Sequence, residues 1–271
     1  MMRKVTGSLL SGLTWFWILL AFFPVGWMFF TSLKTEQDAA TIPPTFAVPL
    51  SFDQYKLVWD RGLSSYMLNS MFSSITSTIL VLAIAIPAAY GLSIRPIRKV
   101  QDVLFFFIST RFLPVAAAIL PLYFILKTIG LLDNITALAL LYGAMNLPIA
   151  VWMMRSFLMD VPREIVEAGQ VDGANLRIEI TRLILPIVAP GVAAVALISF
   201  IFAWNEYFLA LILTSDAART LPPYLASFVD GRGQFLAVLS AASTLAVLPV
   251  VVAGWAAQKQ LVRGLAMGAV K

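Results

Sequence analysis

Long apolar runs without charged residues dominate the chain and are separated by short charged intervals. Six such runs occur, the third interrupted only by Arg111: residues 5–33, 62–94, 103–126, 134–154, 183–205 and 233–258. A helix that crosses the hydrocarbon layer needs about 20 mostly apolar residues, and each run is long enough to contribute one. The pattern therefore predicts six transmembrane helices, at about 12–33, 67–94, 103–126, 136–157, 184–213 and 236–258.

The composition supports an integral membrane protein. Of the 271 residues, 60% are hydrophobic and 12% are charged, whereas soluble domains have about 25% charged residues. So few polar residues could not cover the wetted surface of a soluble protein of this length. The first apolar run is longer than that of a signal peptide and no small-residue cleavage site follows it, so we expect it to be retained. One all-α membrane domain over residues 1–271 is predicted.

The basic residues predict which side of the membrane each loop faces. With the N-terminus inside, twelve Lys and Arg residues lie on the cytoplasmic side and six lie outside, which is the usual asymmetry. Three of the twelve belong to the short loop RPIRKV at 95–100. Both termini are therefore expected in the cytoplasm. The net charge of +5 fits this asymmetry better than nucleic-acid binding, since no basic run exceeds two residues.

Several kinds of chemistry are excluded by what the chain lacks. It has neither cysteine nor histidine, which excludes disulfides, thiolate or imidazole metal sites, and catalysis by either residue. No G-x-x-x-x-G-K-[ST] motif occurs, because no lysine follows a glycine. We therefore expect no enzyme activity, bound metal or cofactor on this chain. If transport uses ATP, a separate polypeptide binds the ATP and Mg²⁺.

Charged residues of both signs gather between the fourth and fifth predicted spans. Glu164 and Glu167 lie in the first turns of a predicted helix, where acidic side chains complement the helix dipole. Gly173 is placed to end this helix in a left-handed conformation, and Asn175 can cap the next one. The loop is therefore predicted to be a short helix–turn–helix in the cytoplasm.

Two roles fit this loop, which we place at 160–183. It could lie on lipid headgroups as an amphipathic connector, or it could dock into a soluble cytoplasmic partner. Membrane-surface helices are rich in Lys and Arg on their polar face, whereas this helix begins with acids. Ile165, Ala168 and Gly169 are expected to form a small apolar face beside the acidic one. Docking to a protein is the favoured role.

The stretch EAGQVDGANLRIEITRLILP at 167–186 resembles the EAA loop of ATP-binding-cassette (ABC) importer permeases. The positions that match this pattern at its spacing are Glu167, Ala168, Gly173, Leu185 and Pro186. Two positions depart from it, since Gly169 replaces the second alanine and Leu183 replaces an isoleucine. Four further segments are similar to permeases of the maltose-type sugar importers: SLKTEQDA…IPPTF (32–46), NLPIAVWMMRSF (146–157), FAWNEYFLALILT (202–214) and QKQLVRGLAMGAVK (258–271), the last most similar to polyol permeases.

The resemblance implies a division of labour among subunits. It implies a bacterial inner-membrane permease of the type I ABC-importer fold, paired with a second, different permease around the substrate path. The loop would be a coupling helix that seats in an ABC ATPase dimer, and an extracytoplasmic solute-binding protein would deliver a sugar or sugar alcohol. The implied ATPase-coupling residues are Glu164, Glu167, Ala168, Gly169, Asp172, Gly173, Ala174, Leu185 and Pro186. The implied tail residues near the ATPase are Gly264, Gly268 and Lys271.

Polar groups inside the predicted spans are candidates for the substrate path, because ionisable groups are costly to place in a membrane. The candidates are Arg111, Tyr123, Asn146, Trp204, Asn205 and Glu206. Acidic and amide groups can hydrogen-bond sugar hydroxyls, and an indole ring can stack on a sugar ring. Hydrogen bonding between helices and anchoring at the membrane interface are the alternatives for these residues.

A stand-alone secondary transporter or channel for a small polar solute is the main alternative function. Such proteins commonly carry intramembrane acids for ion coupling and inverted repeats. Glu206 is the only acid within a predicted span, and no internal repeat is evident. A membrane-embedded enzyme is disfavoured, because no pair of carboxylates lies at span depth. The prediction is a permease subunit that imports a sugar or polyol by ATP-driven alternating access; which sugar is not indicated.

Overall fold

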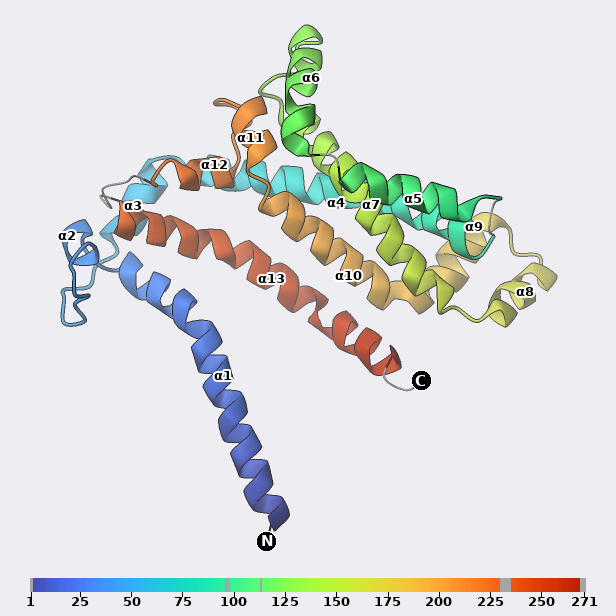
Figure 1. The fold of residues 1–271 in the computed structure, drawn as a ribbon, viewed down its shortest axis with the longest axis horizontal. Coiled ribbons are helices and arrows are strands. Elements are labelled where there is room, and N and C mark those ends of the chain that lie inside the picture. Colours follow the sequence, from blue (N-terminus) through green and yellow to red (C-terminus); the bar gives the residue numbers. More distant parts are fainter. Residues whose placement is uncertain (1, 96–97, 113, 230–234, 269–271) are drawn as a thin grey trace. The chain divides into compact units, whose positions relative to one another are not determined.

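The structure is a computed structural model that describes residues 2–95, 98–112, 114–229 and 235–268 (Figure 1). These residues form helices and connecting segments, with no β-strand among them. Five helices are long and apolar enough to cross a membrane: α1 (Met2–Ser32), α4 (Leu63–Ser93), α7 (Ile135–Met159), α10 (Leu185–Trp204) and α13 (Leu236–Gly268). A sixth crossing results if α5 (Val100–Arg111) and α6 (Val115–Thr128) are counted as one bent span.

Two of the six predicted spans are interrupted. The third, expected to be continuous over 103–126, breaks between α5 and α6, where Pro114 precedes the first residue of α6. Proline has no N–H with which to continue the hydrogen bonds of the preceding helix. The fifth, expected over 184–213, ends as α10 at Trp204 and resumes as the short helix α11 (Phe208–Leu213). Polar side chains at the second break are described with the candidate site.

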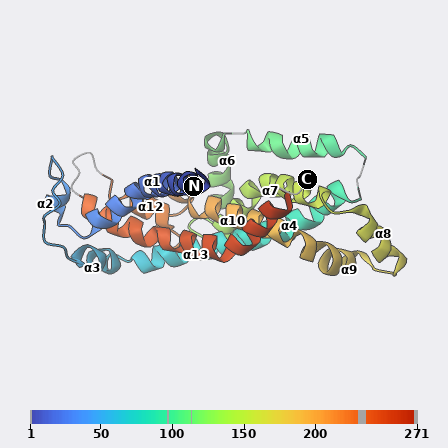
Figure 2. The same cartoon turned by 90° about the horizontal axis from the view of Figure 1, so that it is seen from below.

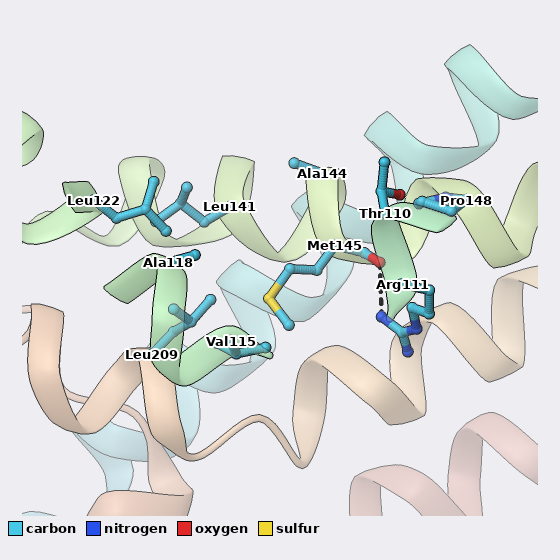
Figure 3. Close-up of a pocket in the computed structure, with 10 residues that line it drawn as sticks. All are labelled: Thr110, Arg111, Val115, Ala118, Leu122, Leu141, Ala144, Met145, Pro148 and Leu209. Carbon is cyan, nitrogen blue, oxygen red and sulfur yellow. Dashed lines mark hydrogen bonds between the residues drawn. The ribbon is translucent and has the colours of Figure 1, made fainter. Parts of the chain in front are cut away.

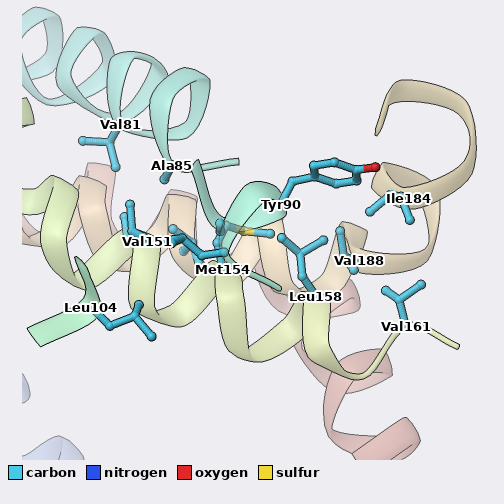
Figure 4. Packing of buried hydrophobic residues seen from close by; sticks show 14 of the residues in the cluster. Val81, Ala85, Tyr90, Leu104, Val151, Met154, Leu158, Val161, Ile184 and Val188 are labelled. Carbon is cyan, nitrogen blue, oxygen red and sulfur yellow. The ribbon is translucent and has the colours of Figure 1, made fainter. Parts of the chain in front are cut away.

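The chain divides into two compact units, and the larger comprises residues 65–223 and 249–271. Within it α7 contacts both α5 and α10 (Figures 1 and 2). Buried apolar side chains from these helices and from α4 pack into one cluster, part of which Figure 4 shows. Lipid is as apolar as these side chains, so close packing holds the helices together. Small residues permit it: a Cβ added at Gly191 would lie 2.3 Å from Cγ of Phe157.

The connection between α6 and α7 is fastened to the segment that follows α11. The Asp133 carboxylate accepts hydrogen bonds from the backbone N–H groups of residues 215–218, at 3.0–3.2 Å. Partial burial alone would raise the pKa of Asp133, but these donors hold it well below its usual range. From α4, Asn69 donates to the carbonyls of Ala217 and Arg219. Two elements therefore hold this segment from different directions.

The smaller unit comprises residues 1–64 and 224–248. It contains α1, α2 (Glu36–Ala39) and α3 (Asp53–Asp60), while α12 (Leu221–Ala226) crosses its boundary. Lys34 is buried: its ammonium group lies over the rings of Trp27 and Phe30 and donates to a backbone carbonyl. The Glu36 carboxylate accepts hydrogen bonds from two backbone N–H groups in the first turn of α13. These two charged residues therefore order the segment after α1.

Candidate coupling loop and candidate substrate path

The charged loop contains the short helix α8 (Arg163–Val171), which begins directly after Pro162. Proline suits the start of a helix, because its missing N–H would have no partner there. Within the larger unit, α8 and the following helix α9 (Leu176–Ile178) lie at one end of α7 and α10 in both views (Figures 1 and 2). The loop therefore projects beyond the apolar helices that flank it.

The side chains of α8 divide into two faces. Val166 is buried in the same apolar cluster as α7 and α10, and Gly169 is buried three residues later. Glu164, Glu167 and Ala168 are exposed. Of the three residues expected on a small apolar face, only Gly169 is buried, because the buried positions follow the spacing 166 and 169. The exposed face of α8 therefore carries Ile165 and Ala168 as well as the two acids.

The end of α8 has the geometry that the sequence predicts. Gly173 has a φ of +80°, which is the left-handed conformation that glycine adopts without strain. Its N–H donates to the carbonyl of Gln170 at 3.0 Å, and the N–H of Ala174 donates to the carbonyl of Gly169 at 2.9 Å. This pair of bonds is a Schellman motif, and Asp172 occupies the C-cap position just before the glycine. The turn is therefore fixed by the backbone.

The two positions that depart from the EAA pattern touch each other. A Cβ added at Gly169 would lie 2.3 Å from Cδ1 of Leu183, far closer than ordinary contact. Leu183 belongs to the segment that leads into α10, so this contact packs α8 against the start of the fifth span. A glycine at position 169 gives the leucine at position 183 the room that it occupies.

The second half of the loop leads into the membrane through a widened helical turn. The Asn175 side chain accepts a hydrogen bond from the N–H of Ile178, so it caps α9 as the sequence predicts. A π-helical segment, η1 (Glu179–Ile184), follows and is continuous with α10, which begins at Leu185. Pro186 lies at this junction, in the first turn of α10.

One charged residue of the loop is buried rather than exposed. Glu179 has no exposed surface, and its carboxylate accepts hydrogen bonds from the Tyr90 hydroxyl and from the Arg95 guanidinium, the latter at 2.9 Å. Arg95 and Glu179 thereby form an ion pair. Three other acids of the loop, Glu164, Glu167 and Asp172, are exposed, and their carboxylates have no partner among the described residues.

Arg111 borders two cavities of the larger unit. One, of about 450 Å³, is lined mainly by apolar residues of α6 and α7 (Figure 3). The other, of about 590 Å³, is lined by polar and aromatic residues of α7 and of the segment 201–208. The Arg111 guanidinium donates to the carbonyl of Met145 at 2.8 Å and lies 5.6 Å from the ring centre of Phe202. Arg111 therefore joins the end of α5 to α7 beside both cavities.

The larger cavity has neutral polar groups on its wall. Asn146 is buried, and its amide makes no hydrogen bond to another described residue. One turn away, the Tyr142 hydroxyl is fully buried and interacts with Glu206 and Thr220. Asn205 donates to the carbonyl of Ile201 and keeps its amide oxygen available. Polar groups shielded from water are normally hydrogen-bonded, so Asn146 and Asn205 can bind a solute or water.

Glu206 lines the same cavity and also caps a helix. Its carboxylate accepts hydrogen bonds from the backbone N–H groups of residues 208–210 at 3.1–3.3 Å, which caps the first turn of α11. Trp204 is buried and stacks on Phe200 with ring centres 5.7 Å apart. Tyr123 packs against the apolar cluster of α6, α7 and α11. Neither aromatic side chain lines the two cavities beside Arg111.

Residues 82–266 match the family described as the binding-protein-dependent transport system inner membrane component. This chain belongs to that family. The permease is 34% identical over 262 residues to the probable ABC transporter permease protein y4oR of Sinorhizobium fredii, with 95% of this chain and 94% of the relative covered. It is 32% identical to the trehalose transport system permease protein SugB of Mycobacterium tuberculosis, with 93% of each chain covered.

A solved structure agrees with this assignment at the level of the fold. The permease superposes with a TM-score of 0.76, at 22% identity, on a chain of a bacterial ABC transporter involved in the import of the acidic polysaccharide alginate. The match covers 95% of this chain and 97% of that one. The expected fold and family are therefore confirmed. The permease is an integral inner-membrane subunit of an importer, and ATP hydrolysis in its family belongs to a separate subunit.

Some predicted residues of the permease are not brought to either site, and some residues were missed. Gly264 and Gly268 lie within α13, and Lys271 lies outside the described residues. Nothing in the sequence connects Tyr90 and Arg95 with Glu179, because 84 residues separate the two members of the ion pair. The available signal was the isolated acid in RIEITRLILP, which is flanked by isoleucines on both sides.

Proposed function

We propose that this permease imports a sugar or sugar alcohol as one of two different permease subunits. An ABC ATPase dimer binds ATP and Mg²⁺ on the cytoplasmic side, where both termini and α8 lie. A solute-binding protein delivers the substrate from the opposite side, and the bundle moves it inward by alternating access. The family description supports a binding-protein-dependent system, and the names of the trehalose and alginate transporters support a carbohydrate.

The observation that carries the coupling role is the division of α8 into an anchored and a free face. Val166 and Gly169 hold the helix against the bundle, whereas Glu164 and Glu167 are exposed without partners. An unpaired acidic face is complementary to a basic cleft in a partner protein. Ala168 and the Asp172–Ala174 turn lie on the same projecting segment and complete the proposed contact surface.

A displacement of α8 can be transmitted directly to the membrane-spanning helix α10. The chain passes from α8 through α9 and η1 into α10 without an unstructured connection, apart from the tight turn at Gly173. Leu185 and Pro186 begin α10, so they lie where the coupling loop becomes the fifth span. The tail residues Gly264, Gly268 and Lys271 are proposed to lie near the same ATPase.

The cavity of about 590 Å³ supports a path for a solute with many hydroxyl groups. Asn146 and Asn205 supply neutral donors and acceptors, and Phe202 and Phe208 supply aromatic walls. Apolar walls with a few convergent polar groups are typical of small-molecule sites. Arg111 borders the cavity, but one of its donors is committed to a backbone carbonyl. Glu206 is committed to capping α11, which leaves the neutral groups as the main ligands.

Charge reversal at Glu167 tests the coupling role. In Glu167→Lys we expect the ATPase to be lost from the purified complex, with an apparent affinity at least about 100-fold lower, because like charges across an interface cost several kcal/mol. Insertion and pairing with the second permease should persist. Asp102→Lys is the matched control, since Asp102 is an exposed acid in the first turn of α5.

Retention of the ATPase and normal uptake by Glu167→Lys would remove the coupling role from α8. A purified chain that transports sugars alone in liposomes, without an ATPase, would instead support the stand-alone transporter. The ATPase measurement does not depend on knowing the substrate, so it separates the two functions directly.

A further inference from the structure

Three side chains join the coupling loop to the second span. Glu179 lies in η1 and is fully buried, Tyr90 lies in the last turns of α4 and is nearly so, and Arg95 follows α4. One carboxylate oxygen of Glu179 accepts from the Tyr90 hydroxyl, and the other accepts from the Arg95 guanidinium at 2.9 Å. Each oxygen therefore has its own donor on the α4 side.

The position of Glu179 makes this contact a junction. Its segment η1 contacts α8, α9 and α10, so it lies where the loop meets the fifth span. Tyr90 also belongs to the apolar cluster that contains Val166 of α8 and Ile184 of η1, which Figure 4 shows in part. The widened turn of a π-helix is uncommon and often marks a functional site. Here it turns an acid inward toward α4.

This contact is a poor device for stability alone. The Glu179 carboxylate is removed from water, which is expensive, while the Arg95 side chain stays half exposed, and well-packed apolar residues usually stabilise a protein as well or better than a buried charge. The apolar cluster around Tyr90 already supplies such packing. The contact instead resists relative movement, because separating Glu179 from either donor would leave a buried carboxylate oxygen without its hydrogen bond. The two sides therefore resist separation and sliding.

We propose that Tyr90, Arg95 and Glu179 form a latch that makes α4 move together with the coupling loop. When the ATPase displaces α8, the fifth span follows through the continuous chain and the second span follows through the latch. Glu179 is thus a positioning residue for transport and contacts neither the ATPase nor the substrate. This inference rests on the proposed coupling role of α8.

Distances between spin labels test the latch without knowledge of the substrate. Because the chain has no cysteine, single cysteines can be added at exposed positions: Ile79 of α4, Leu140 of α7 and Ile187 of α10. The complete complex, with its ATPase and second permease, is measured without nucleotide and with ATP, Mg²⁺ and vanadate. In the unlatched variant Glu179→Gln, we expect the nucleotide-induced change in the α4–α7 distance to fall by more than half.

The matched measurements separate the latch from general damage. The α10–α7 change should persist in Glu179→Gln, because α10 is connected through the chain itself. Tyr90→Phe, which removes one hydroxyl, should reduce the α4–α7 change by a smaller amount. Combining Tyr90→Phe with Glu179→Gln should add little to the effect of Glu179→Gln alone, since the two residues act as a unit. Arg177→Gln removes an exposed charge near η1 and should change neither distance.

An α4–α7 change of wild-type size in Glu179→Gln overturns the latch, as does an α4–α7 distance that does not respond to nucleotide in the wild type. If Glu179→Gln fails to assemble, the test rests on Tyr90→Phe. A nucleotide-induced α4–α7 change of wild-type size in that variant refutes the proposal. Loss of the ATPase from Tyr90→Phe also refutes it, because the latch does not contact the ATPase. Failure of the coupling role would appear separately, as retention of the ATPase by Glu167→Lys.

Discussion

Replacing Gly169 with alanine tests whether α8 is anchored by the contact with Leu183. The new Cβ would lie 2.3 Å from Cδ1 of Leu183, and ordinary contact begins at 3.4 Å. The leucine methyl group or the helix must therefore move by about 1.1 Å, the difference between these two distances. Overpacking of this kind costs roughly 1–3 kcal/mol.

Helix propensity acts in the opposite direction at this position. Gly169 lies inside α8, where alanine is preferred over glycine by about 0.8–1 kcal/mol. If the contact with Leu183 is real, the overpacking cost should exceed the gain in helix propensity, and Gly169→Ala should have a net destabilising effect of about 1 kcal/mol. If it is absent, the substitution should be stabilising by about the same amount. The sign of the change therefore decides between the two cases.

Thermal unfolding of the purified permease pair in nanodiscs measures this sign, with Gly169→Ala, Leu183→Ala and the double variant compared. A change of 1 kcal/mol shifts the melting temperature by about 2–4 °C for a protein of this size class. We expect Gly169→Ala to melt lower, and Leu183→Ala to cost less in the Gly169→Ala background than alone. A higher melting temperature for Gly169→Ala, with additive effects in the double variant, would refute the anchoring contact.

Two further predictions concern the other end of the larger unit and the cavity. Asp133→Asn should lower the melting temperature and expose the segment 215–218 to proteases. The substitution replaces a carboxylate oxygen that accepts from three donors, and this loss should cost roughly 3 kcal/mol. The pKa of Asp133 is depressed in the folded state. The stability that Asp133 contributes is therefore fully present above the unfolded pKa of about 3.9 and is lost as pH falls through the folded pKa. A free energy of unfolding that declines between pH 8 and 5 in the wild type but not in Asp133→Asn would contradict this. Asn146→Leu should reduce uptake of the transported sugar about tenfold with the ATPase still bound, while Ile149→Leu on the same helix should not; equal uptake by both would remove Asn146 from the path.

The sequence pattern was sufficient wherever a local rule determines the structure. The left-handed end of α8 follows from Gly173, and the cap of α9 follows from Asn175, because each depends on residues within one turn. The breaks in the third and fifth spans were harder to predict. Membrane helices often tolerate proline, so Pro114 alone does not indicate a break. The break after Trp204 gives Glu206 a helix to cap, a structural role that the sequence did not indicate.

Glu179 shows why the junction between loop and membrane could not be read from periodicity. The buried positions Ile184 and Val188 are four residues apart, as an α-helix requires, and the same spacing counted backwards gives Ile180. The π-helical turn inserts one extra residue, so that Glu179, five residues before Ile184, also faces the interior, beside Ile180, which packs against the same cluster. An ordinary α-turn would leave this carboxylate at the edge of the buried face, away from the Tyr90 hydroxyl. The same local widening that hides the residue from sequence analysis is therefore what makes the connection to α4 possible.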